Sequence, residues 1–541
     1  MPQISSGQKT LEMVLSEVDP VTSDGEEMEP FTSGEEEEED DGEENTALPP
    51  AQKKARLEAC TGSEQTAKDG TVWHEQNLGC PLPHSPVECY SADGQPTIPV
   101  RQKATTRLES FLCFITPDML QSIQRWTVRH GKDTEDNWFL SVSELMAFIA
   151  IIFLRGITKL PALRDAWSEK LGNPGIMMIM SRNRFQDIMR HLRFDDKETR
   201  AKRVEKDRFA AISDLWSCFV TNCISSYDPG RHINVDEQLL PTRTRCSFLQ
   251  YVPTKPDKFG IKFWAACDLK TKYVCNMIPY LGKDLNRPSE VRPERDVVMQ
   301  LMEPFLDQGR TVTTDHVFTS MELAKQLLER KTNLIGAIKR IRRELPESTL
   351  DLQQYSTQVF STPVAALTVY AAKRKKPVYI LSTMHDVVET NKTGKMKPNT
   401  LLDYNKTKCG VDAMDQIVRS YTVRAGTRRW PVAVFYNMLD IAALNAQVLH
   451  QACTGVNERR VDFLVELASE LADSHLVEQS ANVKNRPRER PATPEPGKRV
   501  KCQVKSRCNS NNTTMRCVDC SRFTCGKCRK ELVCKCNDCA A

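Results

Sequence analysis

The chain has 541 residues, of which 40% are apolar, and this length and composition fit about two to four globular domains. The net charge is +4, but the first 100 residues carry 22 acidic and 5 basic side chains, so the rest carry 70 basic and 49 acidic ones. This basic excess favours a polyanionic partner such as nucleic acid, and the longest apolar run, residues 145–154, is too short to span a membrane.

Residues 1–100 include the acidic stretch SGEEEEEDDGEE and scattered Pro, Ser and Gly. Such a segment repels itself and offers little apolar surface to bury, so we expect it to be disordered. Its KKAR stretch, residues 53–56, is either a nuclear import signal or a solvated charge cluster. Because the chain does not open on a secretory signal, we expect a nuclear protein with reduced cysteines.

Helical periodicity dominates from about residue 105 to 230. The stretch SVSELMAFIAIIFL places Ser141 and Glu144 at capping-box spacing before an apolar run, which predicts a buried helix. The stretch SRNRFQDIMRHLRF, residues 181–194, predicts an amphipathic helix with several arginines outside its apolar face. It is either a DNA-contacting helix or an ordinary helix with solvated arginines.

After residue 230 the pattern changes to short β-branched and aromatic runs. HINV is followed by GIKFWAACD and KYVCNMIPYLG, which are separated by LKT and predict a hairpin. RTVTTD predicts a strand that ends at Asp315, followed by a helix with Thr319 and Glu322 as a capping box and by the strand TNLIGAI. AALTVYAAKRKKPVYILST predicts a further hairpin, and a long helix begins near Pro431. The order strand, acid, helix, strand indicates an α/β layer.

Three aspartates follow predicted strands or begin a helix: Asp236, Asp315 and Asp412. Like charges in one cleft repel each other, so such a cluster is stable mainly when divalent cations neutralise it. Mg²⁺ prefers oxygen ligands of this kind. Aspartates at strand ends also serve as helix or turn caps, which is the structural alternative. Asp415 lies three residues after Asp412, on the same helical face.

Three long blocks of the sequence resemble the core of piggyBac-type transposases, and the match runs in order over about residues 105–475. The blocks begin VDEQLLPTRTRCSF, TTDHVFTSMELAKQ and CGVDAMDQIVRSYT. The resemblance implies an RNase H-like catalytic domain in which Asp236, Asp315 and Asp412 hold two Mg²⁺ ions, with Asp415 as an assisting acid. It also implies cut-and-paste transposition of double-stranded DNA, with hairpin intermediates at the transposon ends and integration at TTAA.

The same resemblance divides the chain into parts. We expect an α/β RNase H-like catalytic core, a mostly helical dimerisation and DNA-binding domain, an insertion domain that is helical in the family, and a small cysteine-rich domain. The boundaries are 1–100 for the acidic region, 101–231 and 422–483 for the helical domain, 232–341 and 399–421 for the catalytic domain, 342–398 for the insertion, 484–500 for a basic linker and 501–541 for the cysteine-rich domain. A homodimer would hold two transposon ends. Neither a membrane nor a small-molecule substrate is expected.

The resemblance places further residues against DNA. Trp430 matches a family tryptophan that packs on distorted DNA, and an aromatic face can replace a lost base stack; a core tryptophan at a helix start is the alternative. Arg428 and Arg429 would lie near phosphates. The basic residues that follow Asp236 either track the DNA backbone or form a solvated face: Arg243, Arg245, Lys255, Lys258 and Lys262.

Nine of the 20 cysteines fall between residues 502 and 539. CxxC pairs have the spacing that lets two thiolates reach one tetrahedral Zn²⁺, and a segment this short usually needs metal to fold. We expect two structural zinc ions, with a disulfide framework as the alternative. The expected ligands are Cys502, Cys508, Cys517, Cys520, Cys525, Cys528, Cys536 and Cys539. One of the nine cysteines is surplus, and the spacing leaves open whether it is Cys534 or Cys536. No histidine follows residue 501, so the coordination would be entirely by cysteine.

Three functions compete at this point. The first is an active transposase, and the four aspartates favour it. The second is a host-domesticated relative that binds DNA or chromatin without cutting. The third is a protein interaction module that uses the cysteine-rich tail as a reader domain.

Overall fold

The computed structural model describes residues 61–253, 255, 257–282, 293–346, 352–373, 376–391, 394–485, 499–504, 508, 511–517 and 522–528. The chain forms two compact units that divide after Asp473. Cys80 is disulfide-bonded, so the expectation of reduced cysteines fails at this position.

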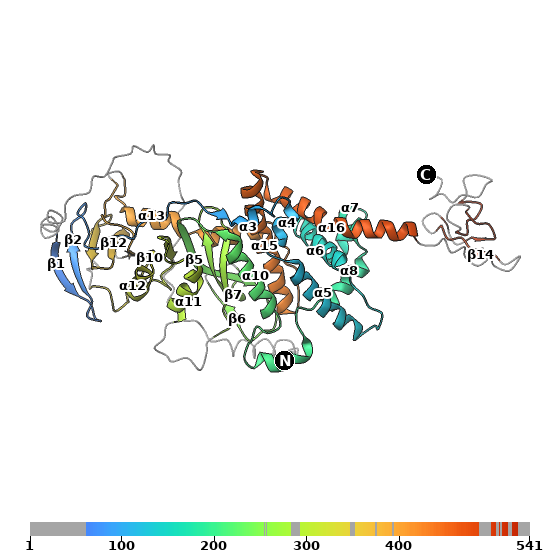
Figure 1. Ribbon diagram of the computed structural model, residues 1–541, viewed down its shortest axis with the longest axis horizontal. Coiled ribbons are helices and arrows are strands. Elements are labelled where there is room, and N and C mark those ends of the chain that lie inside the picture. The colour runs from blue at the N-terminus through green and yellow to red at the C-terminus, as the bar shows by residue number, and fades with distance from the viewer. Residues whose placement is uncertain are drawn as a thin grey trace, which may run out of the picture. The chain divides into compact units, whose positions relative to one another are not determined.

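An eleven-stranded sheet organises the first unit (Figure 1). The strands follow the order β1-β2-β11-β12-β13-β10-β9-β5-β7-β6, and β8 pairs with β7. The parallel pairs are β5 with β9 and β9 with β10, and the other pairs are antiparallel. The strand bounds are β1 Thr61–Thr66, β2 Val72–Gln76, β5 His232–Pro241, β6 Leu249–Tyr251, β7 Phe259–Asp268, β8 Val274–Pro279, β9 Thr311–Thr314, β10 Asn333–Ala337, β11 Thr357–Ser361, β12 Ala366–Lys373 and β13 Lys376–Ser382.

Helices cover the middle of this sheet. Helix α14 (Gly410–Ser420) packs on β5 and β7, α12 (Met321–Glu329) on β10, and α13 (Asn399–Thr407) on β10 and β13. Helices α10 (Ser213–Ser226) and α11 (Pro293–Met302) pack on β8. The strands β7 and β9 are buried along almost their whole length, as expected for strands covered on both faces. The predicted hairpin β7–β8 and the order β9, α12, β10 are confirmed.

A group of helices lies beside the sheet, next to α10 and the long helix α15 (Trp430–Thr454) (Figure 1). It comprises α3 Ile98–Arg101, α4 Arg107–Leu112, α5 Pro117–Lys132, α6 Val142–Thr158, α7 Pro174–Ile179, α8 Arg182–His191, α9 Lys197–Val204 and the start of α16 Arg460–Asn485. Helix α6 is the predicted buried helix. Helix α15 is long and apolar enough to cross a membrane, but 89% of its most apolar window is buried inside the protein.

Both expected capping boxes differ in detail. Ser141 caps α6 by accepting from the backbone N–H of Glu144, but the Glu144 carboxylate binds Arg184 instead of returning to the cap. Helix α12 is capped by Ser320, which accepts from Leu323 N–H, and not by Thr319. The Thr319 hydroxyl instead donates to the carbonyl of Asp315, which closes the turn after β9.

Two expectations about domain organisation are wrong. Residues 61–100 are not disordered: β1 and β2 form a hairpin whose β2 pairs with β11, and Trp73 is completely buried. Residues 1–60 lie outside the described residues. The described part of residues 342–398 contains β11, β12 and β13 and no helix, so the insertion is not helical there. These strands extend the same sheet that carries β5 and β9, because β13 pairs with β10.

Candidate active site

The three aspartates meet at one edge of the sheet. Val235 of β5 pairs with Thr314 of β9 in parallel register, so the next residues lie at the same level: Asp315 directly follows β9, whereas Asp236 lies inside β5. In α/β sheets, this carboxyl end of parallel strands is where ligands bind. Asp412 lies in the first turn of α14, which packs on β5. Asp236 lies close enough to Asp315 and Asp412 to feel their charges. The expectation that a strand ends at Asp236 is wrong, because β5 continues to Pro241.

Asn234 fixes the helix that carries Asp412 to the two strands. Its side-chain oxygen accepts from Val411 N–H at 2.8 Å, and its amide group donates to the carbonyl of Thr313 at 3.3 Å. Gly410 allows this close approach, because a Cβ on it would lie only 2.7 Å from the Asn234 Cβ. Sequence reasoning missed both residues, although Asn234 stands two positions before Asp236 on a buried strand.

Three acidic side chains and one lysine lie close together at this edge. Burial raises the pKa of Asp236 to about 8, and the neighbouring carboxylates of Asp315 and Asp412 add to the shift. Lys255 opposes it, since its ammonium group lies 3.1 Å from Asp412 Oδ1 and also faces Asp236. The Asp315 carboxylate accepts from the backbone N–H and ring of its neighbour His316. Asp412 is the most open of the three, with 61% of its side chain exposed.

Asp415 lies one turn along α14 and has partners of its own. Its Oδ1 accepts from Gln238 of β5 at 3.2 Å, and its Oδ2 lies 2.9 Å from Arg419. Gln238 also accepts from Asn437 of α15, so it links the site to the helical group. Asp415 is therefore tied into the scaffold, whereas Asp412 faces solvent.

The donor set suits hard divalent cations. Three carboxylates without a cysteine or histidine among them are oxygen ligands of the kind that Mg²⁺ prefers. The carboxylate oxygens of the three aspartates do not form a compact cluster. In the described part of the chain, the group whose ligand atoms all lie within 4.8 Å of one another is formed by cysteines.

Some residues around Trp430 are packed inside the protein, and others are exposed to solvent. The Trp430 ring stacks on Phe209 at 5.4 Å and meets Phe248 edge-on at 5.1 Å, yet it remains partly exposed. The Arg429 guanidinium donates to the last carbonyls of α8, at Leu192 and Met189, and burial lowers its pKa. Arg428 is exposed. A core role thus explains Arg429 fully and Trp430 in part.

The basic residues that follow Asp236 also differ from one another. Arg243, Arg245 and Lys258 are exposed. Lys262 forms an ion pair with Glu237 at 2.5 Å and lies over the ring of Trp264, so its charge is used inside the protein. Lys255 is held among the aspartates, as described above.

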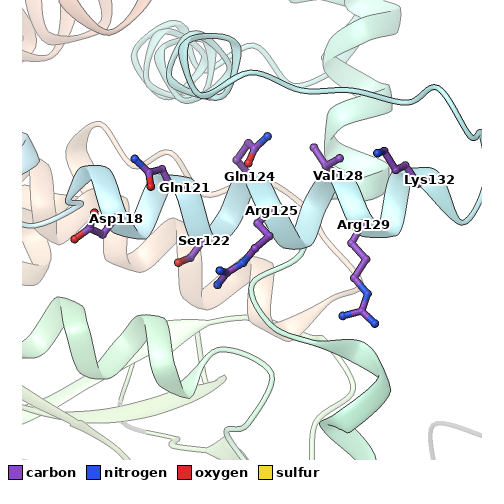
Figure 2. Close-up of a pocket in the computed structure, with 8 residues that line it drawn as sticks. All are labelled: Asp118, Gln121, Ser122, Gln124, Arg125, Val128, Arg129 and Lys132. Carbon is purple, nitrogen blue, oxygen red and sulfur yellow. The ribbon is translucent and has the colours of Figure 1, made fainter.

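Two of the arginines in or just after α8 are engaged in the protein, whereas Arg182 and Arg190 are exposed. Arg184 binds Glu144 and Asp187, and Arg193 donates to backbone carbonyls of its own turn. The neighbouring helix α5 is more open: a shallow pocket of about 730 Å³ runs along it (Figure 2). Three of its eight lining residues are basic; the full lining is Asp118, Gln121, Ser122, Gln124, Arg125, Val128, Arg129 and Lys132.

The second unit contains a cluster of four cysteines. The sulfur atoms of Cys502, Cys508, Cys525 and Cys528 all lie within 4.8 Å of one another, which fits one tetrahedral zinc ion. All four were expected ligands. Cys517 packs against them in the core of the unit but is not a member of the cluster. Cys520, Cys534, Cys536 and Cys539 lie outside the described residues, so the second zinc site stays a prediction.

Comparison with known proteins identifies the family and several relatives of the chain. Residues 106–447 match the family model described as Transposase IS4. Two human relatives are the piggyBac transposable element-derived proteins 3 and 2. The first is 24% identical over 466 residues, covering 80% of this chain and 75% of the relative. The second is 22% identical over 383 residues, covering 65% and 62%.

A solved structure has a similar fold. It is the cryo-EM structure of a piggyBac transposase synaptic complex with hairpin DNA, which matches with a TM-score of 0.71 and 28% identity, over 83% of this chain and 100% of that one. The family model covers more than half of the chain, and the mixed α/β fold agrees with it. The chain therefore belongs to the piggyBac family of transposases, within the IS4 transposase group.

Proposed function

We propose that the chain is a cut-and-paste DNA transposase with an RNase H-like catalytic domain. The observation that carries this proposal is the proximity of Asp236 inside β5, Asp315 directly after β9 and Asp412 in the first turn of α14. In this proposal the chain hydrolyses a phosphodiester at each transposon end, transfers strands through hairpin intermediates and integrates at TTAA. A homodimer would hold the two ends.

The three aspartates would hold two Mg²⁺ ions, which supply electrostatic activation of the attacking oxygen and stabilisation of the leaving oxygen. The chain's own residues do the rest. Asn234 and Gln238 orient the helix that carries Asp412 and Asp415, so the acids keep a fixed spacing without bound DNA. Lys255 provides a positive charge at the same edge, where a scissile phosphate would lie.

DNA contacts outside the acids would come from exposed basic residues. Arg243, Arg245, Lys258 and Arg428 are open to solvent near the strands and helices that carry the aspartates. The pocket along α5 adds Arg125 and Lys132 in the helical group. Lys262 and Arg429 contribute less to this proposal, because their charges have partners inside the protein. The exposed part of the Trp430 ring could stack on a distorted base step.

A domesticated DNA-binding protein is the second candidate function. The two human relatives are both named as transposable element-derived proteins, and they share 24% and 22% identity with this chain. Such a protein would bind DNA through the same basic surface without cutting it.

Cleavage of a donor plasmid separates the two candidates. The donor carries a marker between the two genomic segments that flank the coding sequence, and hairpinned ends are detected on denaturing gels in Mg²⁺. We expect the wild-type chain to produce them, and Asp236→Asn, Asp315→Asn and Asp412→Asn to lower the yield by about a hundredfold or more while DNA binding persists. Asp307→Asn, at an exposed ion pair with Arg330, is the control.

Equal cleavage by the wild type and the three variants would contradict the proposed active site. Binding of the donor without any cleavage by the wild type would favour the domesticated protein.

A further inference from the structure

A sharp turn follows β10 at the edge that carries the aspartates. Gly336 of β10 pairs with Thr314 of β9, so β10 ends level with Asp315. The chain then reverses within four residues, and the N–H of Arg342 donates to the carbonyl of Lys339 at 3.1 Å. Arg340 and Ile341 occupy the tip of this turn. We call residues 339–343 the β10 turn.

The most exposed large apolar side chain among the described residues is at this tip. Ile341 is 83% exposed, although isoleucine is a residue that folding normally buries. A single exposed apolar residue is common on protein surfaces and carries little meaning by itself. Its setting is unusual here, because four of the five residues of the β10 turn are basic: Lys339, Arg340, Arg342 and Arg343.

The β10 turn is held rigidly at its base. Arg342 donates to the carbonyl of Val317, two residues after Asp315, at 3.1 Å. On the other side, the β1–β2 hairpin supports the chain that leaves the turn: Asp69 N–H donates to the carbonyl of Arg343 at 3.2 Å, and the Trp73 indole donates to the carbonyl of Glu344 at 2.8 Å. The tip therefore projects from a fixed base.

The basic side chains beside Ile341 remain available for a partner. Lys339, Arg340 and Arg343 are exposed, and none of them forms an ion pair with any residue that the structure describes. Guanidinium and ammonium groups around an apolar tip can bind phosphates on both sides of a base step while the apolar side chain enters it. A protein partner would need acidic side chains and an apolar pocket to bind this tip, and no feature of this edge favours a protein over DNA.

We propose that Ile341 is an apolar wedge that enters a base step of double-stranded DNA beside the site of strand cleavage. This inference rests on the proposed function, because it uses the three aspartates to locate the scissile phosphate. The basic residues of the β10 turn bind the flanking phosphates, and the β1–β2 hairpin keeps the tip from retreating. The wedge would unstack the step and hold the DNA in a bent form, as apolar side chains inserted between base steps do in other DNA-bending proteins.

Fluorescence of 2-aminopurine tests the wedge without any cleavage. The probe is a duplex with a nick at its centre and 2-aminopurine next to the nick, and Ca²⁺ replaces Mg²⁺ so that the DNA stays intact. We expect the wild-type chain to increase the fluorescence on binding, because unstacking relieves quenching. Ile341→Ala should lose at least half of that increase and weaken binding by about tenfold.

Matched variants assign the effect to the tip. Leu171→Ala removes another exposed apolar side chain, 64% exposed in the helical group, and should change neither signal. Lys339→Gln combined with Arg343→Gln should weaken binding and flatten its salt dependence, while the fluorescence of the saturated complex stays high. Ile341→Leu should retain most of the increase.

The wedge and the proposed transposase activity can fail independently of each other in these experiments. An unchanged fluorescence increase with Ile341→Ala would overturn the wedge, whether or not the wild type cuts DNA. If Asp236→Asn still unstacks the probe but the wild type never cleaves a donor, the wedge stands and the transposase proposal fails.

Discussion

When no cation is bound, the charged form of the Asp236 carboxyl group is disfavoured. Burial and the carboxylates of Asp315 and Asp412 raise its pKa to about 8, whereas an unfolded chain holds aspartate at about 4. Between these two values the folded protein binds more protons than the unfolded chain. The free energy of unfolding therefore falls as pH rises from about 4 to about 8. The same repulsion that lowers stability makes the site a good cation receptor.

This reasoning gives a prediction for Asp236→Asn, which cannot ionise. In the presence of a chelator, the variant should melt at a higher temperature than the wild type. The difference in melting temperature should grow between about pH 5 and pH 8 and then level off. Each kcal/mol of stability difference corresponds to about 2 to 4 °C. Thermal melting across this pH series measures it. Asp307→Asn is the contrasting control, because a hydrogen bond from Arg330 lowers the pKa of Asp307. A constant gap between Asp236→Asn and the wild type would contradict the electrostatic account.

At the scale of elements, the position of Asp412 depends on how closely α14 lies on β5. Gly410 makes that approach possible, since an added Cβ would meet the Asn234 side chain at 2.7 Å. Gly426 offers a control, because a Cβ there has no atom within 4 Å. Neither glycine has a positive φ, so alanine is free of backbone strain at both.

We expect Gly410→Ala to move α14 away from β5 and to weaken the binding of Mn²⁺, used as a spectroscopic substitute for Mg²⁺. Overpacking of this kind costs about 1 to 3 kcal/mol, which exceeds the gain of about 1 kcal/mol from the better helix former. Electron paramagnetic resonance of free Mn²⁺ gives the affinity. Gly426→Ala should bind Mn²⁺ like the wild type. Equal affinities for all three proteins would show that α14 does not depend on this contact.

Which elements could be predicted from sequence follows from their local patterns. The hairpin β7–β8 and the helix α15 were predictable, because each has a continuous apolar run of the right length between turn residues. The β1–β2 hairpin was not, since TGSEQT and VWHEQ contain little apolar alternation and gain their stability by pairing with β11, almost 300 residues away. The β12–β13 hairpin was predicted and is confirmed, whereas the pairing of β11 with β2 and of β13 with β10 depends on the long-range fold.

Only part of the candidate site could be predicted from the sequence. A predicted strand end indicated Asp315 and a predicted helix start indicated Asp412. Asp236 was also expected at a strand end, but it lies inside β5. The partners that orient them, Asn234, Gln238 and Lys255, become recognisable only when β5, α14 and the chain before β7 lie together. Likewise, nothing in the local sequence of Ile341 separates an exposed tip from a buried strand residue.

At the scale of the whole molecule, acidic and basic residues are strongly separated along the chain. Residues 1–60 carry 17 acidic and 4 basic side chains, whereas residues 61–541 carry 54 acidic and 71 basic ones. An acidic segment tethered to a basic protein competes with DNA phosphates for the same cations. The structure also moves the boundary of that segment from residue 100 to residue 60, because residues 61–76 belong to the sheet.

Deleting residues 1–60 should therefore strengthen the binding of a random-sequence duplex at low salt. The gain should shrink as salt increases, since the Debye length falls from about 10 Å at 0.1 M to about 3 Å at 1 M. Fluorescence anisotropy at several salt concentrations measures both effects. Deleting residues 1–100 instead removes the buried Trp73 and the support of the β10 turn, so this longer truncation should melt at a lower temperature and bind DNA less well than the shorter one. Equal low-salt affinities for the full chain and the 1–60 deletion would mean that the acidic segment does not compete with DNA.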